Sequence, residues 1–107
     1  MTEQKKSRRQ MLEEFIAKKP DDAFSRYGLA LECSNTGDTA AADTHFRTLT
    51  DQFPDYIPAY LMYAQMLARI ERADDARQIL TKGISAALHK GDDHARSEME
   101  SLLADLS

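Results

Sequence analysis

The sequence repeats itself at an interval of 34 residues, and this period limits the possible folds more than any single motif does. A shift by one period places similar residues on one another: Pro20 on Pro54, Leu29 on Tyr63, Ala30 on Ala64, Cys33 on Leu67, Ala42 on Ala76 and Phe46 on Leu80. Self-similarity at a fixed period indicates a repeat architecture, in which similar units stack along the chain.

Apolar residues recur at helical spacing through almost the whole chain. The predicted helices cover residues 5–18, 22–35, 39–52, a fourth segment that begins near 58, 73–89 and 92–106. Pro20 and Pro54 end helices, Gly37 and Gly91 form turns, and Pro58 fits the first turn of its helix, where its missing N–H costs nothing. The sequence therefore predicts an all-α fold of about six helices, each antiparallel to the next.

Each helix after the first carries an apolar stripe that we expect to be buried. The stripes are Leu29, Ala30 and Cys33; Ala42, Phe46 and Leu49; Tyr60, Tyr63, Ala64 and Leu67; Ala76, Leu80, Gly83 and Ile84; and Ala95, Met99, Leu102, Leu103 and Leu106. The first helix has Met11, Leu12, Phe15 and Ile16 at the same spacing. The last helix is charged on its other face, as expected of a terminal repeat that must stay soluble.

Composition favours a globular cytoplasmic protein. Apolar residues make up 42% of the chain and charged residues 30%, and the apolar stretch Ile57–Leu67 is too short to cross a bilayer. Because no apolar run follows the basic residues at the N-terminus, no signal peptide is expected. Cys33 is the sole cysteine, so no disulfide forms within the chain.

Charge is distributed unevenly along the chain. The net charge of −4 argues against nucleic acid as the main partner. Basic residues gather near the start of the chain: Lys5, Lys6, Arg8, Arg9, Lys18 and Lys19. Acidic residues gather near its end: Asp92, Asp93, Glu98, Glu100 and Asp105. This asymmetry can favour head-to-tail contact between copies, or it can reflect ordinary solvated faces.

The repeated residues resemble the tetratricopeptide repeat, a helix–turn–helix unit, and the chain is similar to a small stand-alone bacterial-type member of that family. The family pattern of a large residue, a small one and a further large one is met by Leu29, Ala30 and Cys33, and one period later by Tyr63, Ala64 and Leu67. Gly37 and Asp38 match its turn, Ala42 and Ala76 its small residue, Phe46 and Leu80 its bulky residue, and Pro54 its proline.

The resemblance implies a single domain over residues 1–107. It contains a preceding half-repeat at 5–18, repeats at 21–54 and 55–88, and a C-terminal capping helix at 92–106. It also implies a right-handed α-solenoid of stacked antiparallel helix pairs. Three positions depart from the family pattern: Arg26 replaces an aromatic residue, Glu71 replaces the turn glycine, and Gly83 replaces a small apolar residue.

In this family the first helices of the repeats line a concave groove that binds peptides or partner proteins. The resemblance places seven residues in that groove: Phe24, Tyr27, Leu31, Asn35, Leu61, Gln65 and Arg69. An apolar and aromatic strip with a few polar groups suits an amphipathic helix or an extended apolar segment. The alternative is that Phe24, Tyr27 and Leu31 pack on neighbouring helices within the stack. The positions that hold a carboxylate clamp in some members are Tyr27, Leu31 and Met62 here, so a chaperone-tail partner is not expected.

The expected function is that of a non-enzymatic interaction module that binds a protein or peptide on its concave face. The alternative is a self-assembling structural protein whose groove mediates homodimerisation. No cofactor, small-molecule substrate, membrane or nucleic-acid partner is expected. Cys33 lies on the core face, where a thiol is inert, and stacked helices offer no nucleophile–base arrangement.

Two polar clusters have weaker functional interpretations. His89, Asp92, Asp93 and His94 surround Gly91, but their spacing is not that of a zinc site, so no metal is expected there. The basic run from Lys5 to Arg9 can contact RNA or an acidic partner.

Overall fold

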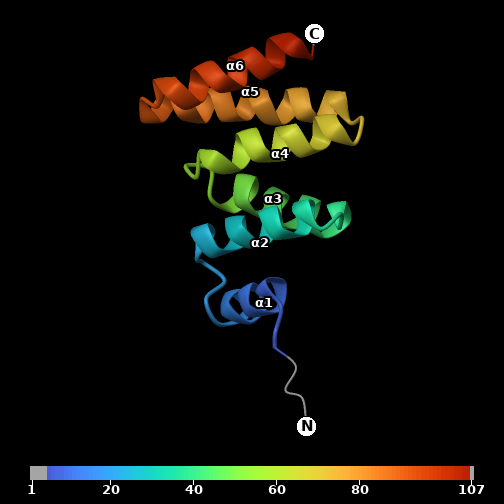
Figure 1. Ribbon diagram of the computed structural model, residues 1–107. Coiled ribbons are helices and arrows are strands. Elements are labelled where there is room, and N and C mark those ends of the chain that lie inside the picture. The colour runs from blue at the N-terminus through green and yellow to red at the C-terminus, as the bar shows by residue number, and fades with distance from the viewer. Residues whose placement is uncertain (1–4, 107) are drawn as a thin grey trace. The chain divides into compact units, whose positions relative to one another are not determined.

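The computed structural model describes residues 5–106, which form six α-helices and no strand (Figure 1). The helices are α1 (Arg8–Lys18), α2 (Ala23–Asn35), α3 (Thr39–Gln52), α4 (Pro58–Arg69), α5 (Ala73–Lys90) and α6 (Asp93–Asp105). The all-α prediction is confirmed, and the helix boundaries agree with the expected ones to within a few residues. The chain divides into two compact units whose boundary falls within α3, between Arg47 and Thr48. We describe each unit in turn.

Side-chain caps explain where several helices begin. Ser7 forms a capping box with Gln10: the Gln10 N–H donates to Ser7 Oγ at 3.1 Å, and the Ser7 N–H donates to Gln10 Oε1 at 2.9 Å. The first helix therefore starts at Arg8, three residues later than expected. Asp22, Asp38 and Asp92 cap α2, α3 and α6 in a similar way, each accepting the backbone N–H three residues further on.

In the first unit, α1 packs on α2 close to Gly28. A Cβ at Gly28 would lie 3.7 Å from the Leu12 side chain, which is ordinary van der Waals contact. Arg9 ties the start of α1 to the turn before α3, because its Nη1 donates to Asp38 Oδ2 at 2.8 Å. The expected core of this unit is confirmed by the burial of Leu29, Ala30, Cys33, Ala42 and Phe46. On α1 only Ile16 of the four stripe residues is buried, and Met11 and Phe15 are exposed.

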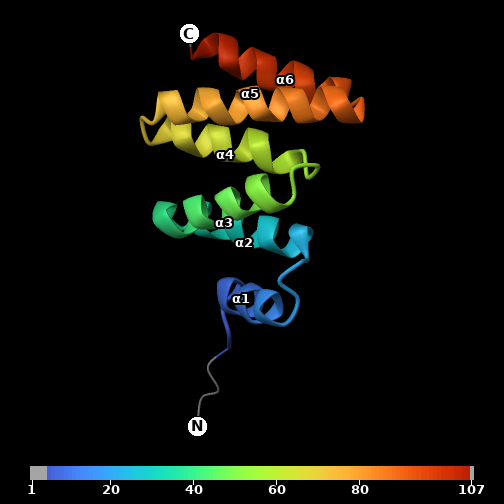
Figure 2. The same cartoon turned by 180° about the vertical axis from the view of Figure 1, so that it is seen from behind.

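In the second unit, α5 lies between α4 and α6, as Figure 1 and the reverse view in Figure 2 both show. The expected core residues of α4 and α5 are buried: Tyr60, Tyr63, Ala64, Leu67, Ala76, Leu80 and Gly83. Ile84 is only half-buried, and Met99 is the fully buried residue of α6. All three helices meet at Gly83. A Cβ there would lie 2.5 Å from Met99 Sδ and 2.6 Å from Tyr60 Cβ, so only glycine fits.

The turn after α2 is a Schellman motif built on glycine. The Asp38 N–H donates to the Cys33 carbonyl at 2.9 Å and the Gly37 N–H to the Ser34 carbonyl at 3.3 Å. Gly37 has a φ of 87°, in the left-handed region that glycine adopts without strain. The same motif with Gly91 (φ 75°) ends α5.

One period later, the turn after α4 forms the same motif without a glycine. The Arg72 N–H donates to the Leu67 carbonyl at 2.8 Å and the Glu71 N–H to the Ala68 carbonyl at 3.2 Å. Glu71 is held at a φ of 63° and is the sole non-glycine residue with positive φ among residues 5–106. The expected irregularity of this turn is therefore a strained residue, while the hydrogen-bond pattern of the first turn is kept.

We predict that Gly83→Ala destabilises the protein. The added methyl would overlap Tyr60 and Met99, and overpacking of this kind costs about 1–3 kcal/mol even though alanine is the better helix former. Gly28→Ala is the matched control, because its Cβ has room. It should raise the free energy of unfolding by about 0.5–1 kcal/mol. Urea denaturation measures both variants, and equal effects of the two substitutions would contradict the close approach at Gly83.

We predict that Glu71→Gly stabilises the protein by about 0.5–1 kcal/mol. The left-handed conformation costs a non-glycine residue about 1–2 kcal/mol, and the greater freedom of glycine in the unfolded chain offsets part of the gain. Gly37→Ala is the reciprocal variant and should lower stability by a similar amount. Thermal unfolding followed by circular dichroism tests the pair. A loss of stability in Glu71→Gly would mean that the glutamate side chain stabilises the turn.

Candidate partner-binding face

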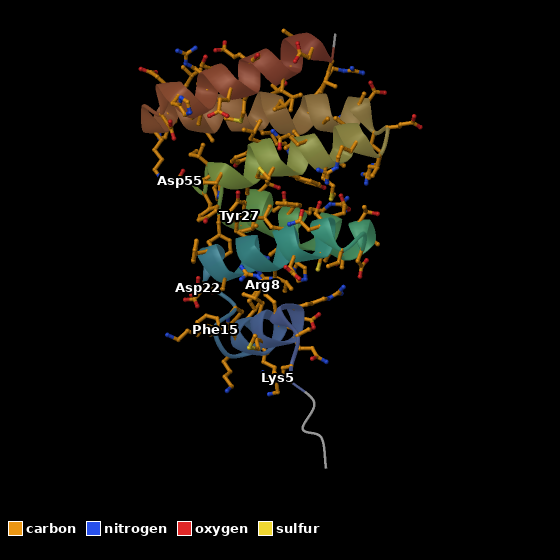
Figure 3. The ribbon with its side chains drawn as sticks, in the orientation of Figure 1. Lys5, Arg8, Phe15, Asp22, Tyr27 and Asp55 are labelled. Atoms are coloured by element: carbon orange, nitrogen blue, oxygen red, sulfur yellow. The ribbon has the colours of Figure 1, made fainter. Side chains whose placement is uncertain are left out.

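The four predicted site residues of the first unit follow one another along α2: Phe24, Tyr27, Leu31 and Asn35. Phe24 is 74% exposed, Asn35 is exposed, and Tyr27 and Leu31 are half-buried. Figure 3 labels Tyr27 on this helix. The buried residues of α2 are Leu29, Ala30 and Cys33. The four site residues therefore form a partly accessible strip outside the core, which we call the α2 strip.

The three predicted site residues of the second unit lie along α4 at four-residue intervals. Leu61 is half-buried, and Gln65 and Arg69 are exposed. The remainder of α4 is largely buried, with Ala59, Tyr60, Tyr63, Ala64, Met66 and Leu67 in the core. Because the other sides of the helix are covered, Leu61, Gln65 and Arg69 mark its accessible side, which we call the α4 strip.

The burial of the α2 strip bears on the alternative that it only packs within the stack. Tyr27 and Leu31 each keep part of their surface accessible while the rest packs against the protein. Phe24 is mostly solvent-exposed. Exposed apolar and aromatic side chains in a row are typical of an interaction surface, and a side chain half-held by its own fold loses little entropy on binding.

Arg26 stabilises the start of α2 through polar contacts. Its Nη2 donates to the Pro20 carbonyl at 3.2 Å, and its Nη1 lies 3.4 Å from His45 Nδ1. Burial lowers the pKa of His45, and the positive charge of Arg26 lowers it further, so neutral His45 accepts this hydrogen bond near pH 7. Arg26 thus replaces the expected aromatic residue with a hydrogen-bonding one.

Tyr60 occupies the same position one period later and makes the same contact. Its hydroxyl donates to the Pro54 carbonyl at 2.8 Å, as Arg26 donates to Pro20. Burial raises the pKa of Tyr60, and the charge of nearby Asp55 adds to the effect, so the hydroxyl keeps its proton. In both repeats a long side chain hydrogen-bonds the carbonyl of the proline that precedes the helix.

The basic run near the N-terminus forms ion pairs with carboxylates of its own unit. Lys6 Nζ lies 2.8 Å from Glu14 Oε2, and Arg8 Nε lies 3.5 Å from Glu32 Oε2. The hydrogen bond from Arg9, followed by that from the Ala41 N–H, holds the pKa of Asp38 below its usual value. These pairs reduce the positive field that a nucleic acid would meet.

The predicted polar cluster around Gly91 is divided among different contacts. His94 Nε2 lies 2.5 Å from Glu98 Oε1, and the Asp92 side chain caps α6. Within residues 5–106, no three His, Cys, Asp or Glu side chains gather as a metal site would require. Cys33 is fully buried, and burial raises the pKa of its thiol.

An open cavity of about 660 Å³ in the second unit was not anticipated from the sequence. It is lined by Thr50, Asp51, Pro54, Asp55, Tyr60, Thr81, Lys82, Ser85, Ala86 and His89. The lining comes from the end of α3, the loop that contains Asp55 (Figure 3), the start of α4, and α5, so no local motif could have indicated it. It places His89 beside two carboxylates, an ammonium group and hydroxyls.

None of the helices described between residues 5 and 106 has the length and hydropathy that a membrane span requires. In this part of the chain, the accessible apolar groups therefore belong to short helices with polar neighbours.

The chain is similar to known repeat proteins. The model of the tetratricopeptide repeat family matches residues 36–106. A TPR repeat-containing protein of Pseudomonas aeruginosa is 30% identical over 89% of this chain and 90% of its own length.

Solved structures agree with this similarity. A tetratricopeptide repeat domain protein of Salinibacter ruber, determined in solution, has a TM-score of 0.78 and 30% identity over 82% of this chain and 89% of its own. A protein of Bordetella parapertussis has a TM-score of 0.79 and 25% identity, covering 95% of this chain and 89% of its own. Tetratricopeptide repeats generally mediate protein–protein interactions. The family match and the full-length relative together show that the chain belongs to the tetratricopeptide repeat family.

Proposed function

We propose that the protein is a non-enzymatic adaptor that holds a peptide or a segment of a partner protein on a concave face to which both strips contribute. The observation that carries the proposal is the α2 strip, in which Phe24 is exposed and Tyr27 and Leu31 are half-buried. Partly accessible aromatic and aliphatic side chains on a rigid helix are the usual anchors of a protein interface.

The two strips have different roles in this proposal. Tyr27 and Leu31 are the anchors, because each combines apolar area with support from the surrounding fold. Phe24 and Leu61 extend the apolar contact. The polar members, Asn35, Gln65 and Arg69, orient the ligand by hydrogen bonds and charge.

The chemistry of the strips favours one class of ligand. An apolar row with a few polar groups fits an amphipathic helix or an extended apolar segment. Arg69 favours a ligand with an acidic group near one end. Binding needs little rearrangement, because the backbones that carry the strips are fixed by buried cores on their other sides.

We further propose that the protein acts in the cytoplasm without a cofactor. The fully buried single cysteine suits a reducing compartment. The net charge of −4 and the internally paired N-terminal cations favour a protein partner over nucleic acid.

The proposal predicts that Leu31→Glu abolishes peptide binding while the helices remain intact. A glutamate at the centre of the α2 strip would place an unpaired carboxylate against apolar ligand surface. We expect peptides selected against the wild type from a displayed random library to bind the variant about tenfold or more weakly, which corresponds to about 1.4 kcal/mol. Fluorescence anisotropy measures the affinity, and circular dichroism measures the helical content.

Leu88→Glu is the matched control, because Leu88 is an exposed leucine on α5 outside both strips. It should bind the same peptides as the wild type does. Tyr27→Ala is a second test at the other anchor. If Leu31→Glu unfolds the protein and Tyr27→Ala binds normally, the α2 strip belongs to the core and the proposal is wrong. If Leu31→Glu instead converts a dimer into a folded monomer, the strip mediates homodimerisation.

A further inference from the structure

The first helix exposes an apolar residue at a repeat position that is buried everywhere else. Phe15, Leu49 and Gly83 are separated by 34 residues and so occupy the same position in successive units. Leu49 is fully buried and Gly83 is buried, but Phe15 is 41% exposed. The surroundings of Gly83 show what Phe15 lacks. Gly83 contacts Tyr60 on the preceding helix, whereas no described helix precedes α1.

Phe15 is part of a stripe on α1 with charged ends. Met11 lies one turn before it and is 54% exposed. By helical spacing Arg8 and Lys18 extend the stripe at its two ends, so two apolar side chains stand between two cations. The Lys18 side chain makes no ion pair within residues 5–106, and the Arg8 side chain is 68% exposed despite its contact with Glu32. We call these four residues the α1 stripe.

The last helix has the complementary deficiency. The same shift of 34 residues places Ser97, Glu98 and Ser101 of α6 on core residues of α4. Those core residues are Tyr63, Ala64 and Leu67, which are buried in the second unit. Their counterparts on α6 are all exposed. With Asp105, one turn beyond Ser101, they form a face that no helix covers in the described chain, which we call the α6 face.

We propose that the α1 stripe of one copy docks on the α6 face of a second copy, head to tail. In this arrangement α1 enters as the second helix that α6 lacks, and α6 covers Phe15 as a preceding helix would. This contact uses neither strip of the proposed peptide-binding face, so it does not rest on the proposed function.

Charge selects the second copy as the occupant. Residues 5–19 contain six lysines and arginines and two glutamates, while residues 92–106 contain five aspartates and glutamates and one arginine. The α1 segment therefore attracts the α6 segment. Two α1 segments repel each other, which disfavours a symmetric contact of α1 with α1. In the docked pair, the small Ser101 leaves room for Met11 and Phe15, and Lys18 and Arg8 lie near the carboxylates of Glu98 and Asp105.

The geometry determines how the assembly grows. A head-to-tail contact leaves one free α1 stripe and one free α6 face, so copies add in open chains and not as closed dimers. Because the contact is small and partly ionic, association should be weak and should decrease with salt.

Sedimentation velocity of the full-length protein over a concentration series tests the proposal. We expect the weight-average mass to rise with concentration at low salt and to fall toward the monomer at high salt. Met11→Glu on α1 and Ser101→Lys on α6 should each weaken self-association about tenfold or more. Both positions are exposed, so the fold should persist, and circular dichroism checks this. Ser85→Lys, an exposed serine of α5 outside the α6 face, is the charge-matched control and should associate as the wild type does.

A mixture of the two variants gives the decisive result. The Met11→Glu copy keeps a functional α6 face and the Ser101→Lys copy keeps a functional α1 stripe, so the mixture should form a discrete heterodimer and nothing larger. A wild type that stays monomeric at high micromolar concentration at low salt would overturn the proposal. So would self-association of Ser101→Lys alone, which would indicate a symmetric α1 contact. If Leu31→Glu removes self-association and Met11→Glu does not, the α2 strip is the contact and this inference is wrong, whereas loss of peptide binding in Leu31→Glu with self-association intact supports both proposals separately.

Discussion

A helix inside a stack must bury one face against the helix before it and another against the helix after it. The second unit shows how narrow the space between such neighbours becomes, because Gly83 of α5 contacts Tyr60 of α4 and Met99 of α6. Van der Waals contact at this distance excludes even a methyl group, so the identity of one residue sets how closely three helices approach. The same requirement determines the ends of the chain, where a helix has a neighbour on one side only.

The 34-residue period preserves contacts more strictly than it preserves residues. Arg26 and Tyr60 share neither charge nor shape, yet each hydrogen-bonds the carbonyl of the proline six residues earlier. Gly37 and Glu71 likewise occupy equivalent turns with the same backbone hydrogen bonds, although only glycine does so without strain. A repeat unit therefore tolerates substitutions that keep the reach of a donor or the direction of the backbone.

Much of the fold could be predicted from the sequence because its periodicity records burial directly. The stripes containing Ala30, Phe46 and Leu67 are buried as expected, since a helix with one apolar side has few ways to pack. The exposure of Phe15 and the contact between Arg26 and His45 could not be predicted, because both depend on neighbours from other parts of the chain. The cavity beside His89 was missed for the same reason. The seven candidate site residues lie on accessible strips, and their role in binding stays a prediction.

The close approach at Gly83 also affects how the second unit moves. Because Tyr60 and Met99 contact the same backbone position from opposite sides, a displacement of α6 removes packing that holds α5 against α4. The terminal helix is therefore coupled to the interior of its unit, and the amide hydrogens of α4, α5 and α6 should exchange with solvent through a shared opening. A surface helix of this kind acts as a lock on the helices beneath it.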